Sequence, residues 1–289
     1  MSELFPQPSG GAVLFARLVK FEHTVFALPF AYVGALLAVG GVPSAHDLLW
    51  ITVAMVGARS LAMALNRLID AGIDAANPRT ANRELPSGAL SIRAVIGFCA
   101  ASLFVFLVAV WQLSPIVRWL WPIPVAAFVI YPYLKRFTWL CHAWLGAVDG
   151  LAPVGAWIAI KGSLSWEAWA LGAAVAAWVA GFDLFYSLFD VGVDREQGLH
   201  SWAVRFGESG VFAGARVLHV ATIALLFAAG IGLGVGFWYW IGLIVVAALL
   251  AYEHRVIGPG DLQRLDQAFF TMNGVISVAF FVFVLFDVI

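Results

Sequence analysis

Nine stretches of predominantly apolar residues, each long enough to cross a lipid bilayer, constrain the fold of this chain most strongly. A membrane-spanning helix needs about 20 such residues. Candidates lie near 24–42, 48–66, 94–113, 117–134, 140–160, 166–188, 211–233, 236–252 and 267–286. Only 11% of the residues are charged, whereas a soluble domain has about 25%. We therefore predict an all-α, polytopic membrane protein of nine transmembrane helices, with residues 1–289 forming a single domain.

Composition also narrows the class of partner. With 16 basic and 17 acidic residues the net charge is −1, which argues against a nucleic-acid partner. The two cysteines, Cys99 and Cys141, lie in or beside apolar runs and have neither disulfide nor metal-ligand spacing. The first eleven residues lack the basic segment of a cleavable signal peptide. The expected surroundings are the lipid bilayer, and no obligate protein partner is evident.

Lysine and arginine are distributed unevenly between the predicted loops. If the N-terminus is cytoplasmic, thirteen of them fall on the cytoplasmic side and two, Arg118 and Lys161, on the other, while Arg59 lies within the second span. This asymmetry follows the positive-inside rule. We predict a multi-pass protein of the cell (inner) membrane, with its N-terminus and two long polar loops, 67–93 and 189–210, in the cytoplasm.

A short motif occurs twice, each time where an apolar span runs into a long polar loop. Residues 70–74 and 190–194 both read D-x-G-φ-D, where φ is apolar, and an arginine follows each copy. Positions four residues apart share one face of a helix. The carboxylates thus extend into two polar stripes: Asn66, Asp70 and Asp74, and Asp183, Tyr186, Asp190 and Asp194. Carboxylates at this spacing repel one another unless a cation lies between them, so we predict two cation-binding clusters that converge on one polyanion.

Ionisation of an allylic diphosphate is the chemistry that this pattern favours. Mg²⁺ takes oxygen ligands and typically binds one or two carboxylates together with substrate phosphates. Metal ions and basic side chains offset the charge that develops on the departing diphosphate. The cytoplasmic-side loops supply five such basic residues, which are Arg79, Arg83, Lys135, Arg136 and Arg195. The allylic cation that remains in an apolar chamber is then open to attack by an electron-rich ring.

Ionisable residues inside the predicted spans are further candidates, because a charge within the bilayer is costly and usually functional. Asp183 continues the second stripe. Arg59 lies two turns before Asn66, on the face of the first stripe. Arg59 and Asp149 either form an ion pair between two helices, or one of the two lines the acceptor pocket. His23, near the start of the first span, is a candidate acceptor contact.

These motifs resemble the signatures of the UbiA superfamily of intramembrane aromatic prenyltransferases. The first reads N-R-L-I-D-A-G-I-D over 66–74, followed by R-T-A-N-R-E-L-P-S-G over 79–88. The second reads D-L-F-Y-S-L-F-D-V-G-V-D-R-E-Q-G over 183–198. Between them, Y-P-Y-L-K-R-F-T over 131–138 is similar to the family's loop after the fourth helix. The resemblance covers about residues 15–210 and implies a nine-helix bundle around a central cavity open to lipid.

The resemblance also implies a role for each motif residue. The Mg²⁺ ligands would be Asn66, Asp70 and Asp74 at one ion, and Asp190 and Asp194 at another, the four aspartates being the catalytic residues. The resemblance would make substrate-binding residues of Arg79, Arg83, Tyr131, Lys135, Arg136 and Tyr186. To these we add Asp183, because it continues the second stripe, and Arg67, which departs from the family pattern. The basic members would contact diphosphate or close loops over it, and the tyrosines would lie near the reacting carbons.

Two positions depart from the family pattern. Arg67 replaces the aspartate that usually follows the asparagine, and His200 stands where 4-hydroxybenzoate enzymes often have lysine. Having arginine at position 67 removes a metal ligand, or a residue next to one. It also adds a positive charge that would bind the diphosphate or the carboxylate of the acceptor. The magnesium count at the first motif stays open. The variant motifs are similar to a bacterial 4-hydroxybenzoate polyprenyltransferase-like subgroup that includes the futalosine-route enzymes of menaquinone synthesis.

The expected reaction transfers a polyprenyl group from polyprenyl diphosphate to 1,4-dihydroxy-6-naphthoate or 4-hydroxybenzoate, in menaquinone or ubiquinone biosynthesis, and releases diphosphate. Prenyl transfer to a haem-type or chlorophyll-type acceptor is an alternative, and so is a cation-coupled membrane transporter. The two motif copies lie four spans apart at one membrane face, whereas transporters place their sites near the midplane, often between inverted repeats. Three candidates remain for the base that removes the ring proton, namely Asp190, Asp194 and diphosphate.

Overall fold

The computed structural model describes residues 11–19, 24–257 and 262–289. His23, predicted as an acceptor contact, lies outside the described residues. The helices, in chain order, are α1 (Gly11–Leu18), α2 (Thr24–Val39), α3 (Ala45–Ile69), α4 (Ala71–Ala76), α5 (Ile92–Gln112), α6 (Val117–Leu120), α7 (Pro122–Leu134), α8 (Cys141–Lys161), α9 (Trp166–Glu196), α10 (Trp202–Leu233), α11 (Phe237–Val256) and α12 (Leu262–Val288). No strand occurs within these described ranges.

Each of the nine predicted spans coincides with helical structure. The fourth span is α6 together with α7, and the other eight are α2, α3, α5 and α8 to α12. Among the described residues, seven spans are long and apolar enough to cross a membrane, and the apolar stretches Ala27–Val39 and Met272–Val288 are shorter. The prediction of an all-α, multi-pass membrane protein is confirmed.

The second predicted polar loop, 189–210, is wrong in extent. Helix α9 continues to Glu196 and α10 begins at Trp202, so only residues 197–201 connect the two helices. Gly207, whose φ of 68° glycine adopts without strain, kinks α10 near its start. The hydropathy of the sequence shows where an apolar span ends, but it does not show where the helix ends. A helix can continue beyond the apolar span through charged residues. The second acidic stripe therefore lies along one uninterrupted helix.

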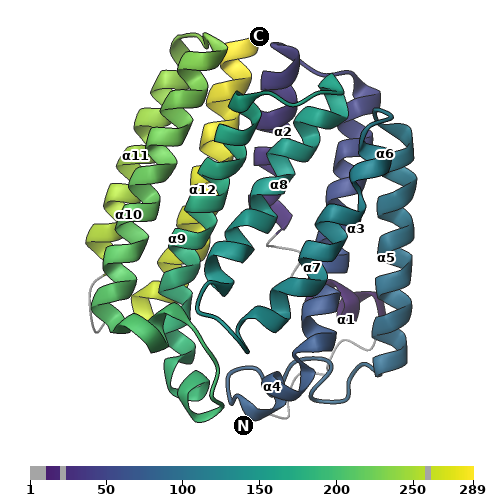
Figure 1. Cartoon of the computed structure of the whole chain (residues 1–289), viewed down its shortest axis with the longest axis vertical. Coiled ribbons are helices and arrows are strands. Elements are labelled where there is room, and N and C mark those ends of the chain that lie inside the picture. The colour runs from purple at the N-terminus through teal and green to yellow at the C-terminus, as the bar shows by residue number, and fades with distance from the viewer. Residues whose placement is uncertain (1–10, 20–23, 258–261) are drawn as a thin grey trace.

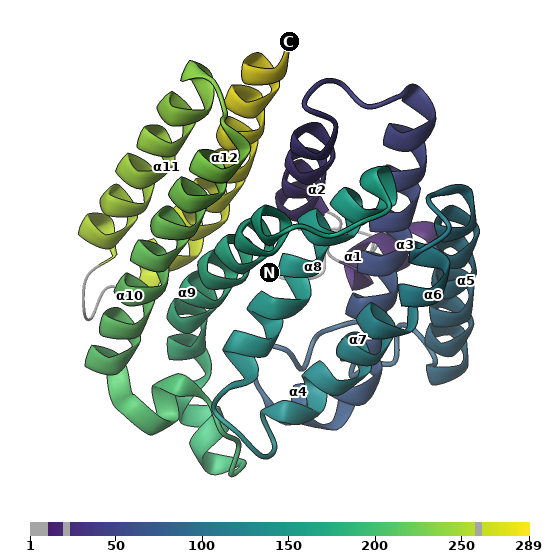
Figure 2. The same cartoon turned by 45° about the horizontal axis from the view of Figure 1, so that its top comes forward.

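The helices form a bundle whose two ends differ. The most extensive contacts join α9 to α10, α8 to α9, and α3 to α5, while α2 packs against α8. Helix α4 lies at one end of the bundle, together with the α7–α8 and α9–α10 connections, and the C-terminus lies at the other end (Figures 1 and 2). Segments that carry the predicted motifs are thus gathered at one end.

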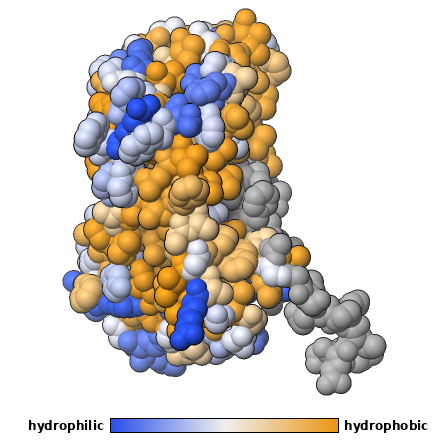
Figure 3. All heavy atoms as spheres, turned by 90° about the vertical axis from the view of Figure 1, so that its right-hand side faces the viewer, coloured by the Kyte–Doolittle hydropathy of each residue, from blue (hydrophilic) through white to orange (hydrophobic). Residues whose placement is uncertain are grey.

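Large apolar side chains cover much of the outer surface. On α5, Phe104 is 68% exposed and Trp111 56%, and on α10 Val217 is 68% exposed. Figure 3, which faces the side of α5 and α6, shows a broad apolar region with hydrophilic side chains gathered mainly toward the two ends. Contiguous exposed apolar surface of this kind marks a membrane-contacting face.

Small residues allow α8 and α9 to approach closely. A Cβ atom at Gly146 would lie 2.1 Å from the main-chain oxygen of Ala176, and one at Gly150 would lie 2.4 Å from that of Gly172. Glycines four residues apart are a common contact surface between membrane helices, because they let the backbones meet. This packing fixes the relative position of α8 and α9, both of which contribute to the site described below.

We expect Gly146→Ala to lower the melting temperature of the purified protein, because the added methyl group forces α8 away from α9. Overpacking of this kind costs about 1–3 kcal/mol. Gly155→Ala is the matched control, since it lies on the same helix with open space at its Cβ and gains about 1 kcal/mol in helix propensity. Indistinguishable melting temperatures for the two variants would contradict the close helix contact.

Candidate active site

A cavity of about 320 Å³ brings the two predicted stripes together. Its wall is formed mainly by α3, α4, α7, α8 and α9. The predicted site residues on this wall are Asn66, Arg67, Asp70, Asp74, Arg79, Arg83, Tyr131, Lys135, Asp183, Tyr186, Asp190 and Asp194. Among the residues that the structure describes, two of the basic residues predicted for the site, Arg136 and Arg195, lie outside this wall. Residues from both motif copies therefore face a single space.

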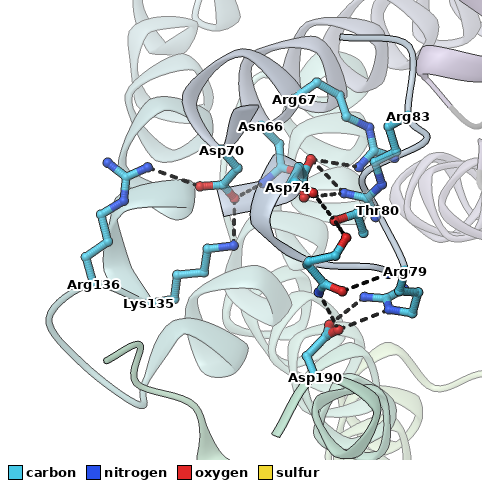
Figure 4. A network of polar contacts seen from close by, with 11 residues as sticks. Asn66, Arg67, Asp70, Asp74, Arg79, Thr80, Arg83, Lys135, Arg136 and Asp190 are labelled. Atoms are coloured by element: carbon cyan, nitrogen blue, oxygen red, sulfur yellow. Dashed lines mark hydrogen bonds and ion pairs between the residues drawn. The ribbon is translucent and has the colours of Figure 1, made fainter. Parts of the chain in front are cut away.

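Asp70 lies at the junction of α3 and α4 and is surrounded by donors (Figure 4). The ammonium of Lys135 is 2.9 Å from Oδ2, the guanidinium of Arg136 is 3.3 Å from Oδ1, and the amide of Asn66 donates to Oδ2 at 3.3 Å. Asp70 is only 3% exposed. Burial raises the pKa of its carboxyl above the usual value, although Lys135 opposes that change.

Asp74, one helical turn further on, is held by two arginines. Nη1 of Arg83 lies 2.7 and 2.8 Å from the two carboxylate oxygens, and Nη1 of Arg67 is 3.9 Å from Oδ2. The Thr80 hydroxyl donates to the main-chain oxygen of Asp74 at 2.9 Å. Arg67, which replaces the aspartate of the usual motif, is 4% exposed. Its charge therefore lies within the first cluster, beside Asp74.

Asp190 connects the second motif to the loop that follows the first. Arg79 donates to both of its oxygens, with Nε 3.0 Å from Oδ1, and Asn77 Nδ2 donates to Oδ1 at 3.0 Å. The side chain of Asn77 in turn accepts from the main-chain N–H of Arg79 at 2.9 Å. Burial lowers the pKa of the Arg79 guanidinium, but the hydrogen bond to Asp190 and the negative charge of Asp190 raise that pKa by more. The pKa of Arg79 therefore lies above its usual value. The two motif copies thus belong to one network (Figure 4).

The rest of the second stripe continues along the cavity wall. Asp194 lines the cavity beside Ser201, and its main-chain oxygen accepts from Leu199 at 2.7 Å. Asp183 lies nearer the middle of the bundle, where its Oδ2 is 2.7 Å from Nδ1 of His142. His142 is buried and also lines the cavity. Asp183 therefore has a histidine partner on α8.

Arg136 turns away from the cavity. Its Nη2 donates to the main-chain oxygen of Ile69 at 2.9 Å as well as facing Asp70, and its guanidinium lies 4.9 Å from the centre of the Tyr133 ring. Arg136 thus supports Asp70 from outside the cavity wall, whereas Lys135 reaches the same carboxylate from within it.

Arg59 and Asp149 form an ion pair between α3 and α8, with Nη1 3.1 Å from Oδ1. Both residues line the cavity, and both also line a second, largely apolar cavity of about 430 Å³, whose wall is formed mainly by α3, α5, α6, α7 and α8. The pair therefore lies where a polar space meets an apolar one.

Several polar residues of the wall were not predicted from the sequence. They are Asn77, Thr80, His142, Ser187, Ser201 and Asn273. Asn77 had a signal, because Asn followed by Pro marks a turn and this turn orients the Asn77 side chain toward Asp190. Thr80 and Ser187 lie within the motifs quoted over 79–88 and 183–198 but were given no role there, whereas His142, Ser201 and Asn273 lie outside those motifs, and the packing of distant helices brings them to the cavity.

The fold and the site define a class: an all-α, multi-pass membrane protein with paired carboxylates and basic side chains around an internal cavity. The UbiA prenyltransferase family matches this chain over residues 27–275. The chain belongs to that family.

Relatives and solved structures agree with this assignment. A 4-hydroxybenzoate octaprenyltransferase of Aromatoleum aromaticum is 30% identical over 92% of this chain and 92% of its own length. The structure of a UbiA homologue from Aeropyrum pernix K1 is 33% identical, with a TM-score of 0.83 over 93% of this chain and 98% of that one. A UbiA homologue from Archaeoglobus fulgidus bound to DMAPP and Mg²⁺ is 18% identical, with a TM-score of 0.68 over 95% and 98%, and supports the fold alone.

Proposed function

We propose that this protein transfers a polyprenyl group from polyprenyl diphosphate to a hydroxylated aromatic carboxylate and releases diphosphate. The supporting observation is that both D-x-G-φ-D copies and four basic side chains, those of Arg67, Arg79, Arg83 and Lys135, line one cavity. The names of the curated relatives point to the same reaction class. Within this class we propose 4-hydroxybenzoate or 1,4-dihydroxy-6-naphthoate as the acceptor, and quinone biosynthesis as the setting.

The donor set of the site fits Mg²⁺. Asn66, Asp70 and Asp74 offer hard oxygen atoms on one side of the cavity, and Asp190 and Asp194 offer them on the other. Within the part of the chain that the structure describes, no three acidic, histidine or cysteine residues are grouped tightly enough to hold a metal by themselves. That arrangement suits an ion that takes one or two carboxylates and completes its shell with phosphate and water. When bound, Mg²⁺ would offset charge on the leaving diphosphate.

The basic side chains would bind the diphosphate group. In the structure Arg79, Arg83 and Lys135 each face a carboxylate at hydrogen-bonding distance. A buried charge needs a partner of opposite sign, and these pairs keep the charged site balanced. The planar guanidinium groups of Arg79 and Arg83 can form bidentate contacts with phosphate oxygens. We infer that these cations turn to the diphosphate as their carboxylates meet the metal.

The remaining features suit the apolar tail and the aromatic acid. The second cavity has the apolar lining that an isoprenoid chain needs, and it adjoins the polar cavity at Arg59. A guanidinium has five N–H donors, and Asp149 uses one of them. Among the described residues Arg59 Nε has no hydrogen-bond partner. We infer that Arg59 binds the carboxylate of the acceptor, while Tyr131 and Tyr186 lie near the reacting carbons.

We further propose that the protein resides in the cell (inner) membrane with the motif-bearing end of the bundle facing the cytoplasm. The motif-bearing connections carry much of the basic charge, as the positive-inside rule requires.

The test is an assay of the purified protein in detergent with farnesyl or geranylgeranyl diphosphate and either acceptor, with products identified by mass spectrometry. We expect a covalent adduct and one diphosphate released per adduct. Removal of divalent metal with EDTA should abolish the reaction, and added Mg²⁺ should restore it, because the developing charge on diphosphate would otherwise be unbalanced. Folded protein that forms no adduct, or substrate flux into proteoliposomes without covalent product, would contradict the proposal and favour transport.

A further inference from the structure

A histidine–carboxylate pair lies in the wall of the cavity, and its carboxylate is not one of the four aspartates that we propose as metal ligands. Nδ1 of His142, at the start of α8, is 2.7 Å from Oδ2 of Asp183 on α9. The side chains are 11% and 22% exposed, and both residues line the cavity. The close packing of Gly146 against α9, one turn further along α8, fixes the two helices at this point. The pair is therefore held in a defined position at the cavity.

The other ring nitrogen of His142 has no partner of its own. Among the described residues, Nε2 is buried and makes no hydrogen bond. The neighbouring thiol of Cys141 faces the main-chain oxygens of Trp139 and His200 instead, at 4.0 and 3.7 Å. Because the Asp183 carboxylate can only accept, Nδ1 carries a proton, and in the neutral ring Nε2 then has a free lone pair. A buried polar atom without a partner is costly, which points to a ligand that pairs with Nε2, and the neutral ring requires that this ligand donate the hydrogen bond.

The position of His142 along α8 suits the hydroxyl end of the acceptor. His142 and Asp149 lie seven residues apart on α8, so they share one face and are separated by roughly 10 Å along the axis. Asp149 holds Arg59, which we propose binds the acceptor carboxylate. Of the two residues, His142 is nearer the connection between α7 and α8. That connection contains Lys135, which lies at the proposed diphosphate end of the cavity. A hydroxybenzoate with its carboxylate at Arg59 would direct its hydroxyl toward His142.

We propose that His142 is the catalytic base for the acceptor hydroxyl and that Asp183 is the residue that positions it. This inference rests on the proposed function and deepens it. The carbon that is attacked lies next to the hydroxyl, so a base at the hydroxyl raises the electron density of the ring where the new bond forms. The same arrangement gives the buried Nε2 of His142 the hydrogen-bond donor that it lacks.

Bond breaking, bond formation and proton movement balance in this reaction. The C1–O bond of the prenyl diphosphate breaks, and its electron pair leaves on diphosphate. The ring carbon next to the hydroxyl bonds to C1, while the hydroxyl proton moves to His142 Nε2 and leaves a neutral dienone. The hydrogen on the attacked carbon is then lost as a proton to the released diphosphate. The oxygen takes its proton back from His142, which restores the aromatic ring and the neutral histidine.

The experiment compares wild type, His142→Gln and Asp183→Asn with two acceptors. The first acceptor, called the parent acid, is 4-hydroxybenzoate or 1,4-dihydroxy-6-naphthoate, according to which of them the wild type prenylates. The second acceptor is the same acid with a fluorine on one of the carbons next to the hydroxyl. Fluorine makes the hydroxyl more acidic, so that at mildly alkaline pH the analogue arrives ionised and needs no base. General-base catalysis typically contributes about 10²- to 10⁴-fold. We expect His142→Gln to lower kcat at least about 100-fold with the parent acid and only a few-fold with the fluorinated analogue. Asp183→Asn should also lower kcat more with the parent acid than with the analogue, but both losses should be smaller.

The controls separate a chemical role from a structural one. His46→Gln, at an exposed position outside the cavity, should match wild type, and melting temperatures will report folding of every variant. Equal losses with both acceptors, or a higher KM with unchanged kcat, would overturn the role as base. Wild-type protein that transfers no prenyl group would overturn the proposed function and this inference together. Wild-type transfer with a fully active His142→Gln would overturn this inference alone.

Discussion

Asp190→Ala is expected to lower prenyl transfer about 1,000-fold or more while the protein still folds. Asp190 accepts from Arg79 and Asn77, and it is one of the two proposed metal ligands on α9. The variant would lose a metal contact and the residue that joins the two motif copies. Stabilisation of a leaving group by a metal ion is worth several kcal/mol, which corresponds to about three powers of ten in rate. The measurement is the initial rate of adduct formation, with the melting temperature measured in parallel.

Glu196→Ala is the matched control for Asp190→Ala. Glu196 is an exposed carboxylate near the end of the same helix, and it does not line the cavity. Its removal changes the net charge by the same amount but leaves the network intact, so activity should stay near that of wild type. A folded Asp190→Ala variant with near-normal turnover would show that the second motif copy does not take part in diphosphate ionisation.

The charge pairs of the site explain how so many ionised groups are held close to a membrane interior. Asp70, Asp74 and Asp190 are each matched by at least one lysine or arginine within 3.0 Å. Removing one partner of a buried pair leaves an uncompensated charge. Binding of a polyanion together with a cation preserves this balance, because each side chain exchanges one oppositely charged partner for another. A site of this type therefore suits substrates that arrive as a metal–diphosphate complex.

The features predicted well are those that local sequence determines. An apolar run of about 20 residues dictates a helix in a bilayer, because each backbone group must find its partner within the segment. Likewise, the spacing of Asn66, Asp70 and Asp74 determines which face they share, whatever surrounds them. Both the nine spans and the location of the first stripe on the cavity wall follow from such short-range rules.

The features not predicted depend on how distant segments meet. His142 and Asp183 are 41 residues apart on two helices, and nothing near either residue in the sequence indicates the other. Lys135 and Arg136 are neighbours in one motif, but the direction in which the chain leaves α7 places the first on the cavity wall and the second behind Asp70. The contact between Arg79 and Asp190 likewise requires the packed bundle.

Arg59→Met is expected to destabilise the protein by about 3–5 kcal/mol, because it leaves the Asp149 carboxylate unpaired inside the bundle. The two side chains are only 19% and 17% exposed, and they meet between α3 and α8. Prenyl transfer should fall as well, since the acceptor would lose its proposed carboxylate contact. The measurements are the melting temperature in detergent and the steady-state kinetics for the acceptor.

The double variant Arg59→Met/Asp149→Leu separates these two effects. Replacing both partners of a buried ion pair by apolar residues of similar size is often neutral or stabilising, so the melting temperature should return to that of wild type. The KM for the aromatic acid should remain at least about 10-fold higher, because a hydrogen bond to a charged group is worth about 1.5–3 kcal/mol. If the double variant regains both stability and acceptor affinity, the ion pair serves only to join α3 to α8. If it regains stability alone, Arg59 acts on the acceptor, and the pair with Asp149 holds that arginine in place.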